Sequence, residues 1–70
     1  MTERALREAH AANDLPTLAR LYADVADAAE ADGEIDSACF FLTHAWVFAL
    51  QAGLAEAERL RERLAAHGRA

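Results

Sequence analysis

The segment from Gly33 to Gly53 reads GEIDSACFFLTHAWVFALQAG and carries the clearest structural signal in the chain. A glycine stands at each end, and the run between them contains neither glycine nor proline, which predicts one helix from about residue 34 to residue 52. At about 100° per residue, apolar side chains lie on almost every side of this helix rather than along one stripe. Neighbouring elements must therefore cover it on more than one side.

The predicted helix 34–52 has an inner face and two outer edges. We expect the inner face to pack on the preceding helix, and it consists of Ile35, Ala38, Cys39, Leu42, Ala45, Trp46 and Ala49. On the other side a polar line of Ser37, His44 and Gln51 separates an edge of Phe41 and Phe48 from an edge of Phe40 and Val47. We expect the next helix to cover one edge. The other is covered by the first helix of the chain or by a second molecule.

Three more helices are predicted around this one, at about residues 3–12, 15–32 and 54–67. Thr2 is placed to cap the first of them, and Asp14 with Pro16 marks the start of the second, because proline is tolerated only in a first helical turn. Leu54, Ala57, Leu60 and Leu64 trace a narrow apolar stripe along the last. The chain is therefore predicted to be a single all-α domain, residues 1–70, of three to four antiparallel helices.

Composition limits the classes of protein to which the chain can belong. The single cysteine, Cys39, indicates a reducing compartment, and the start has no signal-peptide pattern. No run of apolar residues reaches the roughly 18 of a membrane span, so we expect a cytoplasmic location. Every basic side chain is arginine, which is typical of a GC-rich bacterial genome.

The formal net charge is −5, and no lysine or arginine occurs between Arg20 and Arg59. Such a surface repels nucleic acid and anionic lipid, so we expect neither as a partner. The acidic side chains of this gap include Asp24, Asp27 and Glu30. They form either a solvated face or a docking surface for a basic peptide.

Helices 15–32 and 34–52 resemble the helix pair of a tetratricopeptide repeat (TPR) when Gly33 is set on the glycine between the motif's helices. The matching positions are Tyr22, Val25, Ala26, Ile35, Ala38, Leu42 and Ala45. Ala29 departs from the pattern, where the family usually has an aromatic residue, and Leu50 stands in place of the closing proline. The resemblance implies a TPR-like helical hairpin with close helix packing at the small residues, and it identifies no ligand.

Two chemical sites are considered and set aside. The run Asp32-Gly33-Glu34-Ile35-Asp36 is similar to the middle of a calcium-binding loop, but Ala28 and Cys39 stand where its first and last ligands would be. His10, His44 and His67 lie on three different helices, so no metal site, catalytic residue or cofactor is predicted.

The sequence therefore predicts a protein–protein interaction module or small adaptor of TPR-like type that self-associates and has no catalytic activity. The candidate interaction residues are Phe40, Phe41, His44, Val47, Phe48, Asp24, Asp27 and Glu30. One alternative is a peptide-binding module that uses the acidic surface. Another is a small-ligand binder or enzyme with His44 in an apolar pocket.

Overall fold

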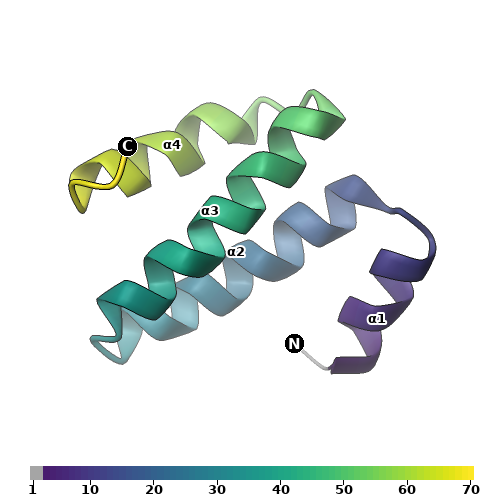
Figure 1. Ribbon diagram of the computed structural model, residues 1–70, viewed down its shortest axis with the longest axis horizontal. Helices are drawn as coiled ribbons and strands as arrows, with labels where there is room; N and C mark the ends of the chain where they lie inside the picture. The colour runs from purple at the N-terminus through teal and green to yellow at the C-terminus, as the bar shows by residue number, and fades with distance from the viewer. Residues whose placement is uncertain (1–2) are drawn as a thin grey trace.

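The computed structural model describes residues 3–70, which fold into four helices without a strand among them (Figure 1). The all-α prediction is confirmed. Thr2, the predicted cap of the first helix, lies outside the described residues. The helices are α1 (Glu3–Ala11), α2 (Leu15–Ala31), α3 (Ile35–Ala52) and α4 (Glu56–Ala66).

Left-handed residues end the helices, as predicted for Gly33 and Gly53. After α2, Gly33 has φ 76°, its N–H donates to the Glu30 carbonyl at 3.0 Å, and the next N–H donates to the Ala29 carbonyl at 2.9 Å. Gly53, with φ 68°, ends α3 through the same pair of bonds. These two bonds satisfy carbonyls that a helix end otherwise leaves unpaired. The resulting short turns make neighbouring helices antiparallel.

The start of α2 also follows the local sequence. The Asp14 carboxylate accepts a hydrogen bond from the Thr17 N–H at 3.3 Å, and Pro16 lies in the first turn. The start of α4 differs from the prediction, because the helix begins at Glu56 rather than near Leu54. Leu54 instead packs, half-buried, against the main hydrophobic core.

Each helix packs on the one before it. α2 and α3 make the most extensive contact, α4 lies on α3, and α1 lies on α2. Figure 1 shows α1 and α4 on opposite sides of the α2–α3 pair. The α2–α3 hairpin is therefore the centre of the molecule.

The α2–α3 contact is built from small side chains. Ala26 of α2 and Ala38, Leu42 and Ala45 of α3 have no exposed surface. Alanines at a helix contact let two backbones approach closely, and Leu42 fills the space between them. Ile35, predicted in the inner face, is instead 38% exposed, because it is the first residue of α3 and no further turn of helix covers it.

α3 is also the described helix that, by length and composition alone, is apolar enough to cross a membrane. The expectation that no segment would meet this test was therefore too strict, since Asp36 is the only charged residue in its 18 positions. Core helices of compact proteins pass the same test. Here α2 and α4 both pack on α3, but only 28% of this 18-residue window is buried.

Replacing Ala38 or Ala45 with leucine is expected to overpack the α2–α3 contact, because neither alanine has exposed surface. Each substitution should lower the free energy of unfolding by about 1–3 kcal/mol. Urea denaturation followed by circular dichroism measures this change. Ala28→Leu, at an exposed position of α2, is the matched control and should leave the transition within about 0.5 kcal/mol. Unchanged transitions for both core variants would show that the two helices are not held at close approach.

Candidate interaction surface

An aromatic cluster fills one flank of the α2–α3 contact, and Tyr22 of α2 is at its centre. The Tyr22 ring stacks on His44 with centroids 5.3 Å apart, on Phe48 at 5.6 Å and on Phe41 at 6.2 Å. Phe41 and Phe48 are each half-buried. The Phe41/Phe48 edge of α3 is therefore covered within the molecule.

α1 completes this cover through His10. The His10 ring meets Phe48 edge-on at 5.9 Å, and its Nε2 is hydrogen-bonded to the Tyr22 hydroxyl at 3.0 Å. Of the two covers considered from the sequence, the first helix is thus the one that reaches a phenylalanine edge. The expectation that the last helix would cover an edge is not met, because α4 joins the inner face of α3. It buries Ala57, Leu60 and Leu64 in the cluster that holds Cys39, Leu42 and Ala49.

The other edge of α3 is exposed. Phe40 is 58% exposed, Val47 42% and Leu50 55%. On a helix with about 100° between residues these side chains lie within about 80° of one another, so they form a single strip. No Asp, Glu, Lys or Arg occurs between Asp36 and Glu56, which leaves the strip without charge. We call Phe40, Val47 and Leu50 the exposed α3 edge.

The polar side chains beside this edge hydrogen-bond to their own helix. The Thr43 hydroxyl donates to the Cys39 carbonyl at 2.8 Å, and His44 Nδ1 lies 2.9 Å from the Phe40 carbonyl oxygen. A carbonyl only accepts, so Nδ1 carries a proton in this contact. Both donors are thereby satisfied internally, and the surface they present is less polar than their residue types suggest.

A shallow hollow of about 210 Å³ lies on this face, lined by Thr43, His44, Val47 and Phe48. It adjoins the exposed α3 edge through Val47. His44 therefore lines a mainly apolar depression, in contact with the Phe40 ring at a centroid distance of 4.5 Å.

The acidic residues predicted as a docking surface are partly neutralised by α4. The Arg63 guanidinium donates to Asp27 at 2.6 Å and to Glu30 at 2.5 Å, while His67 Nε2 contacts the other Glu30 oxygen at 2.7 Å. Asp24 is exposed and has no ion pair among residues 3–70. Only one of the three predicted acidic residues thus remains free.

Beyond Arg63 and His67, Arg69 pairs with Asp36 at 2.6 Å. No role was predicted for these basic residues, because they lie 33 to 37 positions along the chain from the acids they contact.

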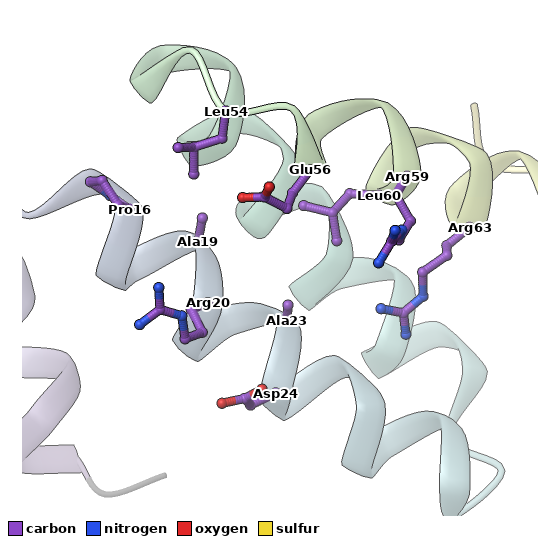
Figure 2. Close-up of a pocket in the computed structure, with 10 residues that line it drawn as sticks. All are labelled: Pro16, Ala19, Arg20, Ala23, Asp24, Leu54, Glu56, Arg59, Leu60 and Arg63. Carbon is purple, nitrogen blue, oxygen red and sulfur yellow. The ribbon is translucent and has the colours of Figure 1, made fainter.

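A second depression, of about 260 Å³, lies between α2 and α4 (Figure 2). Its lining residues are Pro16, Ala19, Arg20, Ala23, Asp24, Leu54, Glu56, Arg59, Leu60 and Arg63. Arg20 and Asp24 come from α2, and Glu56 and Arg59 come from α4. None of these four is in an ion pair within the described part of the chain. The groove is therefore apolar at its base and carries both signs of charge on its walls.

Within residues 3–70 no three side chains of His, Cys, Asp or Glu lie close enough together to hold a metal ion. The run from Asp32 to Asp36, considered for calcium, spans the α2–α3 turn and the first two residues of α3, where Asp36 is paired with Arg69. Cys39 is buried.

Comparisons with protein-family models, with curated proteins and with solved structures found no match to this chain. The TPR resemblance therefore rests on the residue pattern alone. Four of its positions, Ala26, Ala38, Leu42 and Ala45, are fully buried at the α2–α3 contact. This agrees with the packing that the motif implies without establishing the family.

The Glu30 contacts generate a prediction of pH dependence. Hydrogen bonds from His67 and from Arg63 lower the pKa of the Glu30 carboxyl below its ordinary value of 4.5. Because the folded-state pKa is depressed, this stabilisation is present above pH 4.5 and is lost as the pH falls through the lower folded value. Glu30→Gln should lower the free energy of unfolding at pH 7 by about 0.2–1 kcal/mol, since the group is partly solvated.

The same comparison at about pH 3 should show a smaller difference, because there the parent carboxyl is increasingly protonated. Asp24→Asn, which removes an unpaired carboxylate from the same helix, is the control and should change stability little at either pH. An equal effect of Glu30→Gln at both pH values would contradict a charged contact with Arg63 and His67.

Proposed function

We propose that this chain is a protein–protein interaction module or small adaptor of TPR-like type, with no catalytic activity, that self-associates in the cytoplasm of a bacterium. The observation that carries the proposal is the exposed α3 edge. Three large apolar side chains lie side by side on a helix with no charged residue after Asp36. Clustered exposed apolar residues mark surfaces that bind other molecules.

The rest of the surface supports a contact through α3. The large apolar residues exposed in the described chain are Ile35, Phe40, Val47 and Leu50, and all four belong to α3. The outward side chains of α1 form exposed ion pairs, Arg4 with Glu8 and Arg7 with Glu3. On α4, Arg61 pairs with Glu58. Among the described helices, α3 is therefore the one that offers an exposed apolar surface to a partner.

Energetics favour a weak association. Complete burial of a large apolar side chain stabilises by about 1.5–3 kcal/mol, and the α3 edge offers three that are only half covered. Loss of translational and rotational freedom offsets much of this gain. A complex in the micromolar range is therefore expected. The net charge of −5, and an edge without arginine, disfavour nucleic acid and anionic membranes as partners.

The groove between α2 and α4 supports a second candidate, the binding of a peptide. Asp24 is the free member of the predicted acidic surface and lines this groove together with Glu56. Arg20 and Arg59 line it as well, so the groove suits a segment with charges of both signs better than a basic one. A small-ligand or enzymatic role for His44 has weaker support, because its Nδ1 is already bonded to the Phe40 carbonyl.

Val47→Glu is expected to abolish association, because it places a charge in the middle of the exposed α3 edge. Sedimentation velocity at about 5–200 µM compares the variant with the parent, which should show a concentration-dependent rise in mass characteristic of micromolar affinity. Ala65→Glu, at an exposed position of α4, adds the same charge elsewhere and should leave the mass unchanged. A parent that remains monomeric throughout would refute self-association through this edge.

A further inference from the structure

We infer that the molecule bound at the exposed α3 edge is a second copy of this chain, with the two α3 helices antiparallel and Phe40 of each copy seated in the hollow of the other. This inference rests on the proposed function and specifies how the two copies meet. One face of α3 carries both a projecting ring and a hollow. In a two-fold contact each copy would place its ring in the hollow of the other.

The projecting group is Phe40, the most exposed large apolar side chain of the described residues. Its backbone carbonyl is occupied by His44 Nδ1, and its ring is in contact with Phe41 and His44 on one side. The ring is thus supported from within the molecule while more than half of the residue faces outward. A supported aromatic ring loses little conformational freedom when it is buried by a partner.

The receiving group is the hollow of about 210 Å³ lined by Thr43, His44, Val47 and Phe48. Val47 is seven residues after Phe40, which is about two turns and 10 Å along the helix and only about 20° around it. The ring and the hollow therefore face the same direction. Four side chains of one helix that surround a gap form the type of hole that receives a side chain from a facing helix.

A two-fold axis beside Thr43 satisfies both contacts together. It lies between Phe40 and the hollow, so rotation about it places each Phe40 against the partner's hollow and reverses the direction of the second helix. Such a contact is isologous, since the same surface serves both copies, and it closes at two molecules. A parallel pairing would instead place Phe40 beside Phe40 and leave both hollows empty.

Charge is compatible with this arrangement although each copy carries −5. Residues 37–55 contain no Asp, Glu, Lys or Arg, so the facing helices contribute no ionic repulsion along this length. The remaining repulsion comes from charges on other elements and is screened by salt. Association should therefore persist or strengthen at higher salt, whereas a charged peptide partner would be released.

The test makes the side chain at position 40 smaller in one variant and the side chain at position 47 larger in another. Phe40→Ala removes the ring, and Val47→Phe fills the hollow, so each variant alone should associate about tenfold or more weakly than the parent. In an equimolar mixture, one contact of the heterodimer is native, and in the other the shortened side chain at position 40 faces the enlarged side chain at position 47. The mixture should therefore recover association, measured by sedimentation with one variant carrying a fluorescent label.

Leu50→Ala is the matched control within the exposed α3 edge. Leu50 lies about 80° around the helix from Phe40 and outside the predicted seam, so its loss should weaken association less than that of Phe40. In a mixture of Leu50→Ala with Val47→Phe, one contact of the heterodimer is again native, but in the other an intact Phe40 meets the filled hollow. Labelled Val47→Phe should therefore bind Leu50→Ala more weakly than it binds Phe40→Ala. Circular dichroism of each variant establishes that helix content is retained.

The outcomes separate the two proposals. Stronger binding of labelled Val47→Phe to Phe40→Ala than to Leu50→Ala supports the antiparallel arrangement. A parent that dimerises, with no recovery in the mixture, overturns this arrangement and leaves self-association standing, whereas a parent that stays monomeric overturns both. Binding of the monomer to phosphatidylcholine vesicles would assign the edge to a lipid surface and would also overturn the inference.

Discussion

The contact between α2 and α3 is the constraint that places the large side chains of α3. Ala26, Ala38 and Ala45 have no exposed surface, and their small size lets the two helices approach along the centre of the molecule. A contact line of alanines has no room for aromatic rings. The phenylalanines of α3 are therefore displaced to its flanks, where their burial depends on what the neighbouring helices supply.

Neighbouring helices cover the two flanks of α3 to different extents. On one flank, Tyr22 stacks on Phe41 and Phe48, and His10 of α1 closes the cluster from outside. α4 packs on the inner side of α3 and leaves the Phe40 flank uncovered. The exposed α3 edge thus results from where α1 and α4 pack around the α2–α3 pair. Small domains bury a limited fraction of their surface, and here the large apolar side chains that stay exposed lie on α3.

Polar interactions separate the ionic part of the surface from its apolar part. Arg63 and His67 draw Asp27 and Glu30 into contacts between α2 and α4, away from the α3 edge. Beside the edge itself, Thr43 and His44 donate to carbonyls of their own helix and leave few donors for a partner. The molecule therefore presents ionic surfaces on its outer helices and an apolar surface on α3, which is the basis of the proposed interaction role.

The all-α class, the ends of α2 and α3 and the small residues of the core could be predicted from the sequence. These features depend on local rules: Asp14 and Pro16 start a helix, Gly33 and Gly53 end one, and a period of 3.6 places Ala38 and Ala45 on one face. Three features depend on the tertiary structure instead: α1 rather than α4 covers the Phe48 edge, Ile35 is exposed, and Arg63 and His67 contact acidic residues more than thirty positions away. Those outcomes depend on how the helices lie against one another in space. Side-chain periodicity shows which face of a helix is apolar, but it does not show which neighbour reaches that face.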